Sequence, residues 1–163
     1  MNKTILLYTL WVGCLMFIAA CSIDRDPCML PKQTITRIGS YTVDTAGNTI
    51  DTLLPKPLLI AISKDTLRGL RFADKSSKLS MVLSSVADTC RYMIVPDSST
   101  GVADTMTFYY QRSLHFLSNS CGYSYFFLLK NITTTTYAID SVKINNAEVN
   151  NDANTPEHVK VYY

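Results

Sequence analysis

The chain has 163 residues, of which 15 are Lys or Arg and 13 are Asp or Glu, so its formal net charge at neutral pH is +2. No two basic residues are adjacent, and this scattered, balanced charge argues against a basic patch of the kind that binds nucleic acid. The two histidines and five cysteines lack zinc-site spacing, and no Gly-rich phosphate loop occurs, so we expect no metal and no cofactor.

The first element is an uncharged, mostly apolar run from Thr4 to Ala20, which follows Lys3 and is followed by Cys21. A positive start, a short apolar core and small residues before a cut are the layout of a secretory signal. With cysteine as the first residue after the cut, residues 1–20 resemble the signal peptide of a bacterial lipoprotein. The resemblance implies that Cys21 carries a diacylglycerol thioether and an acylated amino group, which would anchor the remaining 143 residues in a membrane.

Two other interpretations of this first element stay open. A retained transmembrane anchor is one, although the apolar run is shorter than the ~20 residues needed to span a bilayer. Cleavage before Cys14 is the other, although Trp11 fits badly near a cut. Ser22 after the lipid cysteine, in place of Asp, favours the outer membrane in lipoprotein sorting. The nearby Asp24 and Asp26 match an acidic surface-export signal only in part, so display on the periplasmic side and display on the cell surface both stay open.

The chain after Cys21 divides into a tether and one domain. Residues 21–31 contain Pro27 and Pro31, which discourage regular structure, so we expect a lipidated tether there. Residues 32–163 contain short runs rich in Thr, Tyr, Val, Ile and Phe, which favour β-strands. The expected strands are 33–43, 58–62, 66–73, 79–83, 90–95, 105–111, 114–117, 123–129, 135–144 and 159–163.

We expect the runs 105–111 and 114–117 to form a hairpin that turns at Arg112-Ser113, and the polar segment 145–156 to be a loop. Short strands at this spacing predict an all-β fold, a single antiparallel β-sandwich of about eight strands.

Three cysteines remain after lipidation, namely Cys28, Cys90 and Cys121. An odd number in an exported protein indicates one disulfide and one free thiol, and three pairings are possible. We predict the pair Cys28–Cys121, which would fix the N-terminal segment to a late strand and contribute about 4–5 kcal/mol in the chain-entropy description. Cys90 would then be a small, buried strand residue.

The second half of the chain carries several motifs in a recognisable order. These are Asp104-Thr-Met-Thr-Phe-Tyr-Tyr110, Phe116-Leu-Ser-Asn-Ser-Cys-Gly122, Ile139-Asp-Ser-Val-Lys-Ile144 and His158-Val-Lys-Val-Tyr162. Together with Cys21 and Cys28 they resemble a family of small Bacteroidota lipoproteins classed as a domain of unknown function. The resemblance implies a fold and a location but no activity, and Cys90 is not part of the family pattern.

Catalytic motifs are weak in this sequence. Ser118 and Ser120 lie near His115, but no G-x-S-x-G nucleophile elbow is present, so we expect that the protein is not an enzyme. The aromatic residues Tyr109, Tyr110 and 123–127 could instead stack on a ligand, although alternation along a strand should bury half of them.

A repeated triplet of Asp, then Thr or Ser, then an apolar residue occurs five times, more often than composition predicts. It resembles the acceptor sequence for O-glycosylation of exported Bacteroidota proteins, and an equally simple reading is that Asp ends a turn where Thr begins a strand. The candidate acceptors are Thr45, Thr52, Thr66, Thr105 and Ser141.

The sequence therefore predicts a lipid-anchored envelope protein, located at the outer membrane, with a structural or partner-binding role. Its expected partners are the membrane itself, through the lipid, and an envelope protein or glycan. The alternative is a lipoprotein that binds a carbohydrate or another small ligand through exposed aromatic residues.

Overall fold

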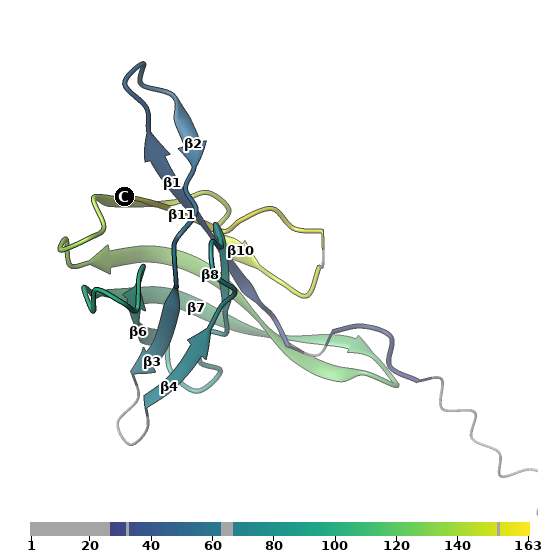
Figure 1. Cartoon of the computed structure of the whole chain (residues 1–163). Helices are drawn as coiled ribbons and strands as arrows, with labels where there is room; N and C mark the ends of the chain where they lie inside the picture. The colour runs from purple at the N-terminus through teal and green to yellow at the C-terminus, as the bar shows by residue number, and fades with distance from the viewer. Residues whose placement is uncertain (1–26, 32, 63–66, 153) are drawn as a thin grey trace, which may run out of the picture.

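A computed structural model of the chain describes residues 27–31, 33–62, 67–152 and 154–163, and these fold into eleven β-strands with no helix among them (Figure 1). The strands are β1 (Thr36–Val43), β2 (Thr49–Asp51), β3 (Leu58–Ile62), β4 (Leu67–Arg71), β5 (Lys78–Met81), β6 (Thr89–Val95), β7 (Asp104–Ser118), β8 (Gly122–Thr134), β9 (Ser141–Ile144), β10 (Glu148–Val149) and β11 (Val159–Tyr162). The predicted all-β fold is confirmed, with eleven strands in place of about eight. Cys21 and the predicted signal peptide lie outside the described residues.

The strands form two sheets in a sandwich-like arrangement. A five-stranded sheet has the order β2-β1-β11-β9, and β5 also pairs with β1. A six-stranded sheet has the order β10-β8-β7-β6-β3-β4, and all its neighbouring strands are antiparallel. β1 and β11 pair in parallel, so the first sheet is mixed, which the purely antiparallel prediction missed.

The core combines apolar side chains from both sheets. Ile38 of β1 and Val161 of β11 are fully buried from one sheet, and Met106 and Phe108 of β7 from the other. Tyr92 of β6 meets the Phe108 ring edge to face, with 6.3 Å between the ring centroids, a geometry that the ring quadrupoles favour. These contacts explain why residues 104–110 of β7, which alternate between buried and more exposed positions, form a strand with one face in the core.

The longest feature is the hairpin of β7 and β8, which projects beyond the rest of the second sheet (Figure 1). The pairing of β6 with β7 ends at Tyr109, and β10 pairs only with Phe127 and Leu128 of β8. Beyond these points β7 and β8 have only each other as ladder partners among the described strands. We call this two-stranded extension, residues 113–126, the arm.

The predicted hairpin turn at Arg112-Ser113 is wrong, because β7 runs unbroken through both residues and the chain reverses at 119–121. The reversal ends at Gly122, whose φ is 73°, a left-handed conformation that costs glycine little and that closes three-residue hairpin loops. Neither Arg112 nor Ser113 is a glycine, which could adopt this conformation at low cost. The Gly122 position was therefore the better turn signal in the sequence.

Candidate functional site

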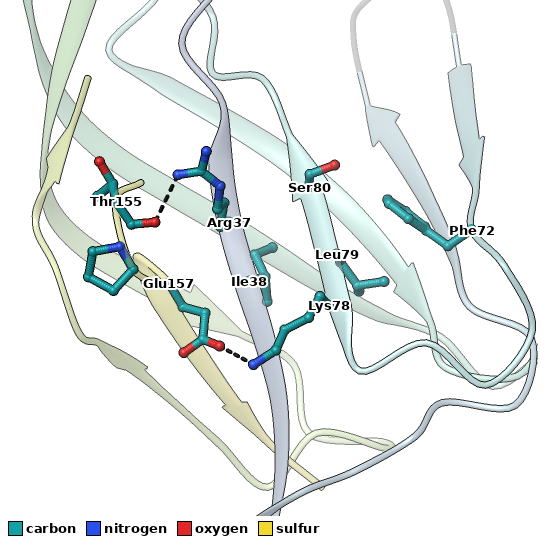
Figure 2. Close-up of a pocket in the computed structure, with 9 residues that line it drawn as sticks. Arg37, Ile38, Phe72, Lys78, Leu79, Ser80, Thr155 and Glu157 are labelled. Atoms are coloured by element: carbon teal, nitrogen blue, oxygen red, sulfur yellow. Dashed lines mark hydrogen bonds and ion pairs between the residues drawn. The ribbon is translucent and has the colours of Figure 1, made fainter. Parts of the chain in front are cut away.

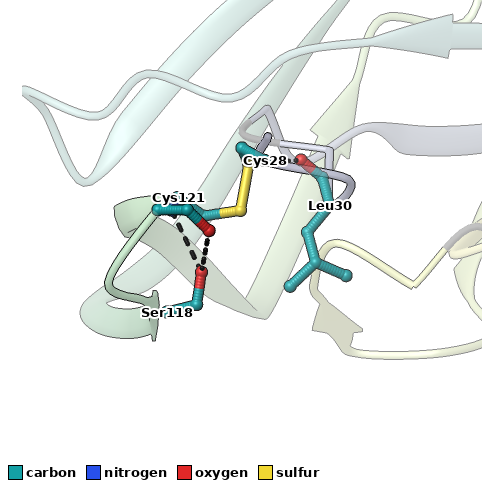
Figure 3. The surroundings of a disulfide bond; sticks show 5 residues. Cys28, Leu30, Ser118 and Cys121 are labelled. Atoms are coloured by element: carbon teal, nitrogen blue, oxygen red, sulfur yellow. Dashed lines mark hydrogen bonds between the residues drawn. A yellow bond between two sulfur atoms is a disulfide. The ribbon is translucent and has the colours of Figure 1, made fainter. Parts of the chain in front are cut away.

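The tip of the arm is joined covalently to the N-terminal segment. Cys28 and Cys121 form a disulfide, as predicted, and it links positions 93 residues apart (Figure 3). The Ser118 hydroxyl accepts a hydrogen bond from the Cys121 backbone N–H at 3.0 Å, which fixes the turn that carries the cysteine. Further along, the Thr34 hydroxyl donates to the Tyr125 carbonyl oxygen at 3.1 Å. Cys28 and Thr34 therefore contact the arm at its tip and further inward, respectively.

One face of the arm is apolar and exposed. The β7–β8 register places Leu114 opposite Tyr125 and Phe116 opposite Tyr123, and residues directly opposite each other point to the same face. The Phe116 and Tyr123 rings contact each other with 5.2 Å between centroids. All four side chains are exposed, by 56%, 37%, 56% and 63% respectively. We call these four residues the arm face.

The arm face continues the surface that forms the core nearer the body. Tyr110 and Leu129 pair on the same face and are buried, and Tyr110 packs edge to face on Phe127 with 5.3 Å between ring centroids. The hairpin is longer than the opposing sheet, so its outer apolar residues have no sheet to pack against. Sequence alternation predicted which residues share a face but not where the covering sheet ends.

The serines and histidine considered for catalysis do not converge. The His115 ring lies on the other face of the arm, where it stacks on Phe126 at 4.3 Å and Nε2 contacts the Ser113 hydroxyl at 3.0 Å. Ser118 instead holds the turn, and its hydroxyl is 3.2 Å from that of Ser120. The histidine thus has the satisfied, structural surroundings of an ordinary strand residue.

A groove of about 430 Å³ lies between β1, β5 and the segment before β11 (Figure 2). Its charged side chains already have partners within the chain. Lys78 pairs with Glu157, the Tyr41 hydroxyl donates to Glu157 at 2.8 Å, and Arg37 donates to the Thr155 carbonyl oxygen at 2.9 Å. Burial raises the pKa of Glu157, but its bonds with Lys78 and Tyr41 outweigh this and hold the pKa below its usual value. The polar side chains that line the groove therefore hold the C-terminal segment against the first sheet.

Gly39 makes the close approach in this groove possible. A Cβ at position 39 would lie 2.7 Å from a ring carbon of Tyr41 and 3.1 Å from the carboxyl carbon of Glu157. Any larger residue would therefore push the tyrosine off the glutamate. This requirement was not visible in the sequence, because Glu157 is far from Gly39 along the chain.

Asp104 organises the far end of β7 and β8. Its carboxylate is 1% exposed and accepts hydrogen bonds from the Thr135 hydroxyl and the backbone N–H groups of Tyr137, Ala138 and Ile139 at 2.5–2.8 Å. Burial raises its pKa, but these four donors outweigh burial and hold the pKa below its usual value. The predicted strand 135–144 is wrong over its first half, because the amides of 137–139 bond to this carboxylate and not to a ladder.

The five candidate glycosylation acceptors have different surroundings. Thr45 is exposed in the β1–β2 turn and Ser141 is exposed at the start of β9, whereas Thr52 is half-buried. Thr105 is half-buried in β7, between β6 and β8, and its backbone N–H donates to the Thr135 hydroxyl. Thr66 lies outside the described residues.

Cys90 is the free thiol among the described residues and lies in β6, where it packs against the core but is half-buried and not fully buried as predicted. Burial raises its pKa to about 11, so the thiol stays protonated at neutral pH. A protonated, packed thiol is a poor nucleophile and metal ligand, and no three His, Cys, Asp or Glu side chains in the described part of the chain lie close enough together to hold a metal ion.

Fold and site together define an all-β domain with a long, disulfide-tied arm. The described residues include no apolar helix of membrane-spanning length. Residues 58–163 match the Family of unknown function (DUF6452), and the chain belongs to that family. The match includes the whole arm with Cys121 and begins after β1, β2 and Cys28. No curated protein and no solved structure matches the chain.

Proposed function

We propose that this protein is a lipid-anchored protein of the bacterial cell envelope, exported by residues 1–20 and acylated on Cys21, with a structural or partner-binding role. The Cys28–Cys121 disulfide carries the proposal, because disulfides persist mainly in oxidising compartments outside the cytosol. The signal-like run that ends at Cys21 supplies the route and the anchor. Ser22 supports the outer membrane as the destination.

The surroundings of the polar side chains support a non-enzymatic role. Catalytic groups need a nucleophile, a base and a group that orients the base within hydrogen-bond reach of one another. The groove carboxylate of Glu157 is instead held by Lys78 and Tyr41, and His115 is stacked on Phe126. These groups stabilise the fold, and we propose that the protein acts through its surface.

The anchor is tested by intact mass and membrane fractionation of the protein expressed in a host with lipoprotein processing. We expect the mass of residues 21–163 plus acyl chains, and two hydrogens fewer before reduction than after it. Cys21→Ser should abolish acylation and membrane retention, while Cys14→Ser, the matched control, should change neither. A mass that begins at Met1, or retention of the Cys21→Ser protein in the membrane, would refute the lipid anchor.

A second candidate is the binding of a carbohydrate or another small ligand, which the exposed aromatic residues of the arm face favour. Aromatic rings stack on the apolar faces of sugars, and Phe116 and Tyr123 offer two adjacent rings. Titration with envelope polysaccharide fragments tests this role. It predicts an affinity that Tyr123→Ala weakens and Tyr137→Ala, at an exposed loop tyrosine, leaves unchanged.

We also propose O-glycosylation of the exported protein, with Thr45 and Ser141 as the accessible acceptors. A glycan is bulky and needs an exposed side chain, which both positions have. Hexose-type increments in the intact mass, lost in the Thr45→Val, Ser141→Ala double variant, would support the proposal. A native mass without any glycan increment would refute it.

A further inference from the structure

The arm face is a contact surface for which the described fold has no partner. Leu114, Phe116, Tyr123 and Tyr125 lie together on one face, and each is more than one-third exposed. Clustered apolar residues on a surface mark contact with another molecule, whereas single ones are ordinary. The cluster is confined to the outer part of the arm, because the same face is buried from Tyr110 inward.

The outer part of the β7–β8 hairpin, which carries the arm face, is uncharged. Residues 113–129 contain no Asp, Glu, Lys or Arg, and Ser and Asn occupy the turn. The nearest charged side chain inward, Arg112, is engaged with Asp88 at 2.6 Å. A surface of Tyr, Phe and Leu with small polar neighbours suits the boundary between lipid headgroups and acyl chains, where tyrosine is enriched.

The position of the N-terminal segment indicates that the molecule in contact with the arm face is a lipid bilayer. The disulfide holds Cys28 at the tip of the arm, and Cys21 is only seven residues earlier in the chain. Seven residues span at most about 25 Å when fully extended, so an anchor at Cys21 keeps the arm tip within that distance of the bilayer. Met29 and Leu30, which are exposed beside the disulfide, add apolar surface at the same end.

We infer that the arm face is a membrane-contacting surface, which lies in the interface of the bilayer that holds the lipid anchor. The inference rests on the proposed anchor at Cys21. The lipid would attach the protein to the bilayer, and the arm face together with the disulfide would set the orientation of the domain relative to the membrane. β8 is 13 residues long, and at about 3.3 Å per residue its far end is held roughly 40 Å from the tip. The loop that contains Tyr137 would therefore lie outside the proposed contact.

A single tryptophan reports on this contact. Trp11 is the only tryptophan of the chain and lies in the predicted signal, so Trp11→Phe gives a background free of tryptophan. Phe116→Trp places the reporter on the arm face. Tyr137→Trp is the matched control, because it replaces an aromatic residue that is 80% exposed at the other end of β8. Each full-length variant is expressed with lipoprotein processing and checked for the disulfide by mass and for folding by circular dichroism.

The acylated proteins are reconstituted into vesicles of phosphatidylethanolamine and phosphatidylglycerol, with or without brominated acyl chains. We expect the tryptophan at 116 to be blue-shifted and quenched about twofold by the brominated lipid, and the tryptophan at 137 to stay unquenched. Flotation of the same samples measures the anchor independently of the arm.

Each other result overturns the inference in a distinguishable way. Flotation without quenching at 116 refutes membrane contact and leaves the anchor intact, whereas failure to float refutes the anchor as well. A blue shift at 116 that needs no vesicles and grows with protein concentration assigns the arm face to a second copy of the chain. A blue shift that appears only with envelope polysaccharide assigns it to carbohydrate.

Discussion

The buried carboxylate of Asp104 gives the sharpest test of the energetics of the fold. Each of its two oxygens accepts two hydrogen bonds, and the set holds residues 137–139 against the end of β7. Asp104→Asn keeps one oxygen and replaces the other by an NH₂ donor, so two of the four donors lose their acceptor. At about 1–3 kcal/mol for each unsatisfied buried donor, the substitution should lower the free energy of unfolding by about 4 kcal/mol.

The assay is thermal and urea unfolding of the purified protein, followed by circular dichroism. A loss of about 4 kcal/mol corresponds to a melting temperature lower by about 12 °C for a domain of this size. Asp88→Asn is the matched control. Its carboxylate pairs with Arg112 at an exposed site, so its loss should cost less than about 1 kcal/mol.

The pH dependence gives a second readout of the same carboxylate. The pKa of Asp104 is lower in the folded protein than in the unfolded chain, so the unfolded chain binds more protons as the pH falls. The stability that this group contributes is complete above about pH 4 and is lost below it. The gap between wild type and Asp104→Asn should therefore narrow in acid. A loss below about 1 kcal/mol at pH 7, or a gap that does not change with pH, would refute this account of Asp104.

Three further outcomes follow from contacts described above. Gly39→Ala should destabilise the protein by about 1–3 kcal/mol in urea unfolding, because its Cβ displaces Tyr41 from Glu157, and a neutral result would contradict the tight approach. Cys28→Ser should lower the free energy of unfolding by up to about 4–5 kcal/mol, and a loss near zero in the oxidised protein would show that the 93-residue loop restrains nothing. Cys90 should be alkylated by iodoacetamide at pH 8 at least about 100-fold more slowly than a thiol of pKa 9, measured by mass, and rapid labelling of the folded protein would disprove its burial.

Local sequence signals predicted those parts of the fold that local physics decides. The run Leu58–Ile62 was predicted as a strand with the bounds that β3 has, because it is compact, apolar and bounded by turn residues. The turn that joins β1 to β2 contains Gly47, whose positive φ of 86° costs glycine little. The short strands β2 and β10 were not predicted, because two or three residues carry no measurable alternation.

The errors occurred where distant residues decide the structure. The segment after Thr134 has strand-forming residues, but its backbone N–H groups donate hydrogen bonds to the Asp104 carboxylate, which is more than thirty residues earlier in the chain. In the candidate site, the odd number of cysteines predicted one disulfide, and the pair Cys28–Cys121 was predicted correctly as the one that would fix the N-terminal segment to a late strand. The exposure of the arm face was not predicted, since it depends on the length of the opposing sheet and not on the arm itself.

The parallel pairing of β1 with β11 has a kinetic consequence. Ile38 pairs with Val159, so the central ladder of the first sheet joins residues 121 positions apart. During synthesis β1 emerges early, and it cannot complete this ladder until β11 has been made. Such non-local contacts slow folding. The first sheet therefore closes late in synthesis, which would suit the export that we propose for this protein.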